Sequence, residues 1–129
     1  MSDNFKLEVI SPNKTIFNSD VKQVTIPAFE GLMTILKDHI SLVTFLRPGF
    51  IEIDTNNKEV KFFVEEGTVE FSKNNLLILS STVKNKKDFK NEDVEKLIEE
   101  YKSEINSVNI RDKEKYILSY KIEALQELK

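Results

Sequence analysis

Hydrophobic and polar residues alternate over short stretches in the first part of the chain, and clusters of turn-forming residues separate these stretches. Alternating or short apolar stretches lie at residues 5–10, 15–17, 21–26, 34–36, 40–46, 50–54, 60–65, 69–71 and 76–79. Turns are expected at Ser11–Lys14, Asn18–Asp20, Arg47–Gly49, Thr55–Lys58 and Lys73–Asn75. A period of two is typical of strands with one buried face, so this pattern favours an antiparallel sandwich or flattened barrel. Leu76–Leu79 is expected as its last strand, and the sheet-forming part is expected to end near Thr82.

The pattern then changes, and residues 84–129 contain no glycine and no proline. Apolar residues recur there in steps of three and four, the period of one helix face. The first stripe comprises Val94, Leu97, Ile98, Tyr101, Ile105 and Val108, and the second comprises Ile117, Tyr120, Ala124 and Leu128, flanked by Leu118, Ile122 and Leu125. Asn91 and Asn109 are expected to cap the two helices, with a turn within residues 103–109. We therefore predict a β-sandwich domain at residues 1–84 and an α-helical hairpin domain at residues 85–129.

Two helices alone bury only the stripes that face each other, and the second helix has apolar residues on more than one face. The hairpin therefore needs a further surface, which is either the sandwich or a partner. This is a physical reason to expect a detachable arm.

Composition excludes several kinds of site. The 129 residues include no cysteine and one histidine, which excludes a disulfide framework, thiolate metal sites and a metal site built from several histidines of one chain. A net charge of −3 provides no basic excess for a nucleic acid. The polar start of the chain and the lack of a long apolar run argue against a secretory signal or a transmembrane helix, so membrane association would need a partner.

The stretch Pro27–Gly49 contains the single histidine, His39, among two glycines and two prolines. No serine, cysteine or acid lies at a motif spacing from His39, so a turn histidine that hydrogen-bonds its own backbone or a neighbouring protein is favoured over a general base. The acids Glu65 and Glu66 point to opposite faces of a strand and are interpreted as a solvated strand end. No glycine-rich phosphate loop is present. These residues predict a binding or structural module with no catalytic site and no cofactor.

One order of motifs is more specific. Glu30–Leu36 is followed by His39 and Leu42, then by the Arg47–Gly49 turn, and further on come Val64–Phe71 and Asn74–Leu79. Over the whole chain, including the two-helix C-terminus, this order resembles the epsilon subunit of the bacterial F-type ATP synthase.

The resemblance implies a flattened antiparallel β-sandwich of about ten strands, followed by the helical hairpin. It implies a non-catalytic rotor subunit of the central stalk, which binds the gamma subunit and the c-ring and couples proton translocation to ATP synthesis in the catalytic head. It also implies a peripheral location at the cytoplasmic face of the bacterial inner membrane, held only through the complex. The arm would be able to extend into the alpha/beta head and inhibit ATP hydrolysis.

Contact residues follow from the same resemblance. The loop Phe29–Asp38 would face the c-ring, and contacts with gamma or the c-ring would lie at Phe29, Glu30, Gly31, Leu32, Met33, His39 and Leu42. In an extended arm, four basic residues of the second helix would be available to acidic partners in the head, namely Arg111, Lys113, Lys115 and Lys121.

The chain also departs from the family pattern. Leu32 stands where the family often has an acid, and Ser41 where it often has proline, so the c-ring contact is expected to be more apolar. Glu65 and Glu66 replace a Ser-Gly pair. Some members bind ATP through an (I/L)-D-x-x-R-A motif, but the matching segment Phe89–Val94 has Lys90 for the acid and Asp93 for the arginine. We expect no nucleotide binding of the family type, because the arginine fork is replaced by a repelling charge.

Residue patterns alone leave two other classes open. One is a free-standing sandwich that binds a small ligand under a helical lid, and the other is a small hydrolase with an unrecognised site.

Overall fold

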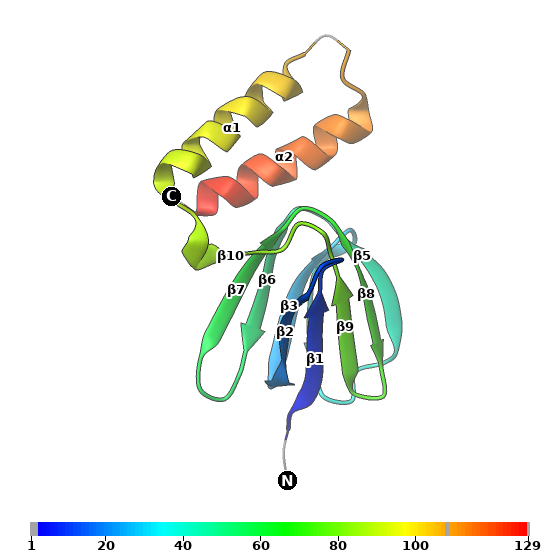
Figure 1. Ribbon diagram of the computed structural model, residues 1–129. Coiled ribbons are helices and arrows are strands. Elements are labelled where there is room, and N and C mark those ends of the chain that lie inside the picture. The colour runs from blue at the N-terminus through cyan, green and yellow to red at the C-terminus, as the bar shows by residue number, and fades with distance from the viewer. Residues whose placement is uncertain (1–2, 108, 129) are drawn as a thin grey trace.

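The computed structural model describes residues 3–107 and 109–128. Within them, ten strands form one sheet that folds over on itself, and two helices lie together at one end of it (Figure 1). The strands are β1 (Phe5–Ile10), β2 (Thr15–Val21), β3 (Gln23–Ala28), β4 (Gly31–Leu36), β5 (Leu42–Leu46), β6 (Gly49–Asp54), β7 (Glu59–Val64), β8 (Gly67–Ser72), β9 (Asn75–Leu79) and β10 (Lys84–Asn85). A short helical turn, η1 (Lys86–Asp88), leads into α1 (Asn91–Ile105) and α2 (Asp112–Glu127). In the described part of the chain, neither helix has the length and apolar character that a membrane crossing requires.

The strands follow the order β10–β7–β6–β3–β5–β8–β9–β1–β2, and β4 pairs with β3 beside this path. The predicted mainly β fold followed by a helical hairpin is confirmed. The pairing of β1 with β9 is parallel, whereas the other described pairs are antiparallel. No local pattern predicts this pair, because its strands come from opposite ends of the sheet-forming segment.

The sheet includes two segments that were expected to lie outside its strands. Asn18–Asp20 were expected to turn, but they belong to β2 and pair with residues 6–8 of β1. Lys6 lies opposite Asp20 in this register, and such cross-strand pairs offset the weak strand propensity of short polar residues. The sheet also continues past Thr82, since β10 pairs with β7, so β9 is not the last strand.

The apolar residues form two separate clusters. The main core lies inside the sandwich and includes Ile51 and Ile53 of β6. The second cluster joins the sandwich to the hairpin and comprises Phe50, Phe63, Val94, Ile98, Ala124 and Leu125. Phe63 lies on the opposite face of β7 from the core residues Phe62 and Val64, yet it is only 4% exposed because the helices cover it.

The helix starts differ from the prediction. Asn91 is the first residue of α1, after Lys90 at the N-cap position, and α2 is preceded by Arg111 in place of Asn109. Neither N-cap side chain bonds a first-turn amide, whereas acids occupy both first turns, where they interact favourably with the helix dipole. These termini are therefore supported by charge and packing more than by capping.

The buried face of each helix follows its stripe only in part. α1 buries Val94 and Ile98 and continues to Ile105, into the segment that was expected to turn. α2 buries Leu118, Ala124 and Leu125, so two of the flanking residues are buried, whereas Ile117 and Tyr120 are only half-buried. Val108 lies outside the described residues.

Candidate functional site

The turn between β3 and β4 presents an exposed apolar tip. Phe29 and Glu30 form the turn, and Gly31 follows with a φ of +130°, a conformation that L side chains rarely adopt. Phe29 is 42% and Leu32 72% exposed. Glu30 is tied to β5, because the buried hydroxyl of Thr44 donates to its carboxylate oxygens across 3.0 and 3.2 Å. This bond holds the tip in a fixed direction.

His39 belongs to the next turn, between β4 and β5. Its Nδ1 lies 2.8 Å from the carbonyl oxygen of Ile40, and its ring packs edge-on against Phe71 with 5.9 Å between centroids. The neighbouring Asp38 is held by Asn74, which accepts the Asp38 N–H across 2.7 Å and donates to its carboxylate across 2.9 Å. The prediction of a turn histidine that bonds its own backbone is therefore confirmed.

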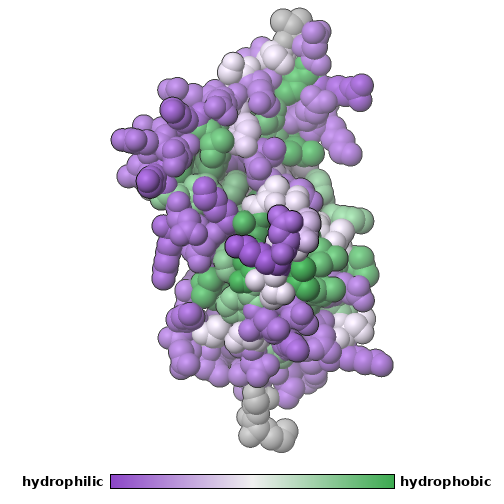
Figure 2. Space-filling view, in the orientation of Figure 1, coloured by the Kyte–Doolittle hydropathy of each residue, from purple (hydrophilic) through white to green (hydrophobic). Residues whose placement is uncertain are grey.

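The outer surface of β5 and β9 carries hydrophobic side chains that face water. This surface, called the apolar face below, comprises Ile40, Val43, Phe45, Leu77 and Leu79. Phe45 and Leu79 flank Thr68 of β8 in register, and the next row places Val43 and Leu77 on either side of the same strand. Val43 is 71% and Phe45 58% exposed. Figure 2 shows hydrophobic residues on the surface of the sandwich, between polar residues of the helices and polar residues of its far end.

This face was not predicted, although the sequence contains a signal for it. The runs 42–46 and 75–79 contain few polar residues to alternate with the apolar ones. Only one side of such a strand faces the core, so the other side must meet water or a partner. The predicted contact residues Met33 of β4 and Leu42 of β5 are partly buried and pack against the main core.

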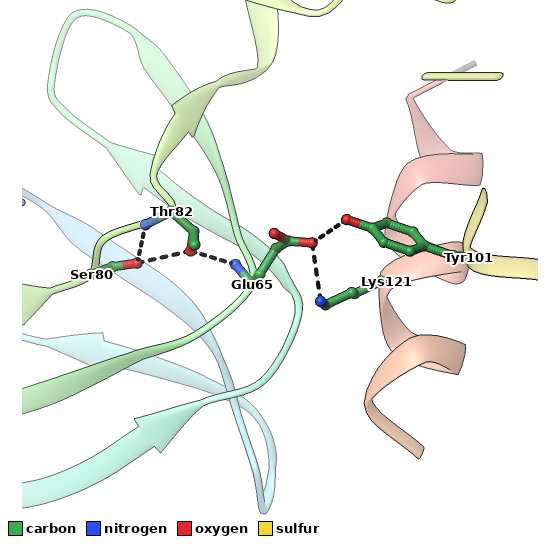
Figure 3. A network of polar contacts seen from close by, with 5 residues as sticks. All are labelled: Glu65, Ser80, Thr82, Tyr101 and Lys121. Atoms are coloured by element: carbon green, nitrogen blue, oxygen red, sulfur yellow. Dashed lines mark hydrogen bonds and ion pairs between the residues drawn. The ribbon is translucent and has the colours of Figure 1, made fainter. Parts of the chain in front are cut away.

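A polar contact joins the sandwich to both helices. The Tyr101 hydroxyl of α1 donates to Oε2 of Glu65 across 2.8 Å, and Nζ of Lys121 of α2 lies 3.5 Å from the same oxygen (Figure 3). Burial, and then the hydrogen bond to Glu65, raise the pKa of the Tyr101 hydroxyl well above its usual value. The interpretation of Glu65 as part of a solvated strand end is therefore wrong.

Glu66 points to the side opposite Glu65, as expected for adjacent residues of a strand, and it bonds within the sandwich. Its carboxylate accepts the backbone N–H of Ser81 across 3.0 Å and the Ser81 hydroxyl across 2.7 Å. The hydroxyl of Ser80, which is 5% exposed, donates to the Glu66 carbonyl oxygen. Glu66 therefore fixes the segment that follows β9.

The Arg47–Gly49 turn forms a second contact with the arm. The Arg47 guanidinium lies 4.2 Å from the centroid of the Tyr120 ring of α2, a favourable cation–π arrangement. A Cβ at Gly49 would lie 2.7 Å from Cβ of Pro27, so only glycine allows the turn to sit this close to β3. A cleft of about 200 Å³ lies between this turn and α2.

The basic residues expected in an extended arm are placed differently from one another. Arg111, Lys113 and Lys115 are exposed, while Lys121 is partly buried beside Glu65. In the segment that matches the nucleotide motif, Phe89 packs against Phe63 with 5.5 Å between ring centroids. Within the described ranges, no cluster of three or more histidine, cysteine or acidic side chains is arranged to bind a metal ion.

Comparison with known proteins gives consistent matches. A family model described as "ATP synthase, Delta/Epsilon chain, beta-sandwich domain" matches residues 4–86. The ATP synthase epsilon chain of Pelagibacter ubique is 41% identical over 129 residues, which cover 99% of both chains. The ATP synthase epsilon chain of a Nitratiruptor species is 35% identical over 108 residues, covering 83% of this chain and 84% of the relative.

A solved structure shows the same fold. A chain of the Euglena gracilis mitochondrial ATP synthase, in a structure of its OSCP/F1/c-ring in rotational state 1, matches with a TM-score of 0.84 at 20% identity, covering 98% of this chain and 82% of the other. The family model spans the sandwich, and the Pelagibacter ubique relative matches the helical arm as well. The chain therefore belongs to the delta/epsilon chain family of ATP synthase, as a non-catalytic stalk subunit of that complex.

Proposed function

We propose that this protein is a rotor subunit at the foot of the central stalk, which couples proton translocation through the c-ring to ATP synthesis in the catalytic head. The observation that carries this proposal is the full-length match to an ATP synthase epsilon chain, over sandwich and arm together. The protein would work as two units, residues 1–84 and 85–129. It would lie peripherally at the cytoplasmic face of the bacterial inner membrane, attached only through its partners.

Two surfaces of the sandwich suit two partners. The β3–β4 tip would contact the loops of the c-ring. It is a small projection on which the apolar residues Phe29 and Leu32 are exposed. The apolar face extends across β5, β8 and β9, and it adjoins the turn that contains His39. We assign this face to the gamma subunit, with Leu42 supporting it from the core side.

The arm would act as an inhibitor of ATP hydrolysis in its extended state. Arg111, Lys113 and Lys115 are exposed at the start of α2 and supply positive charge for acidic residues of the head. Lys121 would join them only after it leaves Glu65. The replaced motif at Phe89–Val94 supports an arm whose position does not depend on ATP, since Lys90 and Asp93 leave no arginine fork there.

A binding measurement with the purified gamma subunit tests the proposal. Phe45→Ser on the apolar face should weaken gamma binding about tenfold or more. Aromatic residues that become buried when a complex forms are common hot spots of interfaces. Tyr116→Ser on α2 is the matched control, since Tyr116 is also an exposed aromatic residue at 44% but does not belong to the apolar face. The control should bind gamma as the unmodified chain does.

Failure of the unmodified chain to bind gamma, or to co-purify with the head subunits, would overturn the proposal. That result would favour a free-standing sandwich that binds a small ligand. Equal weakening by both variants would remove only the assignment of the apolar face.

A further inference from the structure

One side chain of the sandwich contacts both helices at a single oxygen atom. Glu65 lies in the connection between β7 and β8, and its Oε2 accepts the Tyr101 hydroxyl of α1 while it lies 3.5 Å from Lys121 Nζ of α2. Figure 3 shows the three side chains converging from the sandwich and the two helices. Lys121 Nζ also lies 5.1 Å from the centroid of the Tyr101 ring, so the two partners of Glu65 contact each other.

Glu65 is held in place from the sandwich side. Its backbone N–H donates to the Thr82 hydroxyl across 3.0 Å, and that hydroxyl lies 3.1 Å from the hydroxyl of Ser80. The Thr82 N–H in turn donates to Ser80 Oγ across 3.2 Å. These hydrogen bonds fix the backbone of Glu65, and with it the position from which its carboxylate contacts the helices.

The surroundings make these polar contacts effective. The side chains of Glu65 and Lys121 are each 23% exposed, so water screens them only in part. A hydrogen bond to an ionised carboxylate is stronger than one between neutral groups. Other contacts of the arm include the apolar cluster around Phe50 and Phe63 and the stacking of Arg47 on Tyr120, which are less directional than a hydrogen bond.

We propose that Glu65 acts as a clasp that holds the helical arm against the sandwich and sets how often the arm leaves it. Both helices contact the same carboxylate, and Lys121 also contacts Tyr101, so the two helices are expected to leave the sandwich together. The inference deepens the proposed function and rests on it, because an arm that inhibits hydrolysis must first leave the sandwich. In the assembled enzyme, loss of the clasp would strengthen that inhibition.

The chain contains no cysteine, so a pair of introduced cysteines can be labelled selectively. Spin labels on T68C in β8 and E99C in α1, both at exposed positions, report the distance from sandwich to arm in the full chain. We expect a single short distance in the labelled parent. E65A should add a longer distance and increase the released fraction about tenfold, which corresponds to about 1.4 kcal/mol.

Three further variants make the test specific. Glu66→Gln is the matched control, because this neighbouring acid bonds Ser80 and Ser81 of the sandwich and should leave the distance unchanged. Y101F and K121M should each increase the released fraction, and neither should add much to the effect of E65A, since the bond is already lost. This non-additivity distinguishes a shared clasp from independent contacts.

A distance distribution in E65A equal to that of the parent would overturn the proposal and leave the apolar cluster as what holds the arm. If E65A fails to fold, Y101F and K121M decide between the two outcomes, because they leave the sandwich sequence unchanged. The measurement uses the isolated chain, so the clasp can fail while gamma binding succeeds, and gamma binding can fail while the clasp is confirmed.

Discussion

Two adjacent glutamates bond different parts of the molecule. Glu65 bonds Tyr101 and Lys121 of the arm, whereas Glu66 bonds the segment after β9. Alternation along the chain correctly places them on opposite sides. The partners were not predictable, because Tyr101 and Lys121 come from helices whose docking no local pattern specifies. Burial of a charge depends on tertiary contacts, and in this chain those contacts form more than thirty residues away.

Gly67, the next residue, has a role that substitution can test. A Cβ at this position would lie 2.7 Å from the Leu79 carbonyl oxygen and 3.0 Å from Cδ1 of Leu46. Because a backbone oxygen cannot swing aside as a side chain can, Gly67→Ala should destabilise the protein by roughly 1–3 kcal/mol. Chemical denaturation measures this loss, with the exposed neighbour substitution Thr68→Ala as control. Equal midpoints for the two variants would contradict the close packing of β8 against β9.

At the scale of elements, the position of a strand or helix within the fold decides whether its hydrophobic pattern predicts it correctly. Strands with one buried face, such as β1 and β8, follow their alternation closely. β2 is an edge strand, so its polar residues stay exposed while it pairs with β1, and composition alone indicated a turn there. β5 and β9 are apolar on both sides, and their second side forms the apolar face. The helix stripes predicted helices but not which residues face inward, since that depends on the sandwich beneath α2.

The pKa of Tyr101 gives the docked arm a pH dependence. Because burial and the Glu65 hydrogen bond favour the neutral hydroxyl, the folded pKa lies above the unfolded value near 10. The stabilisation is therefore fully present below about pH 10 and is lost as the pH rises through the folded pKa. The absorbance of tyrosinate during an alkaline titration follows the ionisation of tyrosine hydroxyls. The difference between the titration curves of the parent and Y101F gives the transition of Tyr101. A transition of Tyr101 at the pH of free tyrosine would show that its hydroxyl is not bonded to Glu65.

At the scale of the whole molecule, the separation of the two apolar clusters is the feature with the widest consequence. The main core lies within the sandwich, and among the described residues of the sandwich the second cluster uses Phe50 and Phe63. The order of strands, turns and helices predicted this division into sandwich and hairpin. It did not predict how the hairpin is attached, because two phenylalanines, one glutamate and one arginine form that attachment from positions scattered along the chain.

A truncated chain tests this separation. Deletion of residues 87–129 keeps β10, and with it the pairing that completes the sheet at β7. The truncated chain should retain β-sheet circular dichroism and cooperative unfolding, because its core is intact. It should also self-associate, since Phe50 and Phe63, which are 8% and 4% exposed in the full chain, would then face water.

Sedimentation measures that association, and Phe63→Ser in the truncated chain should reduce it without unfolding the sandwich. In the assembled ATP synthase, the truncation should raise the rate of ATP hydrolysis if the arm inhibits, and leave gamma binding unchanged because the apolar face is untouched. An unchanged hydrolysis rate with normal gamma binding would remove the inhibitory role and preserve the coupling role. A truncated chain that cannot fold would instead show that the second cluster is part of one indivisible core.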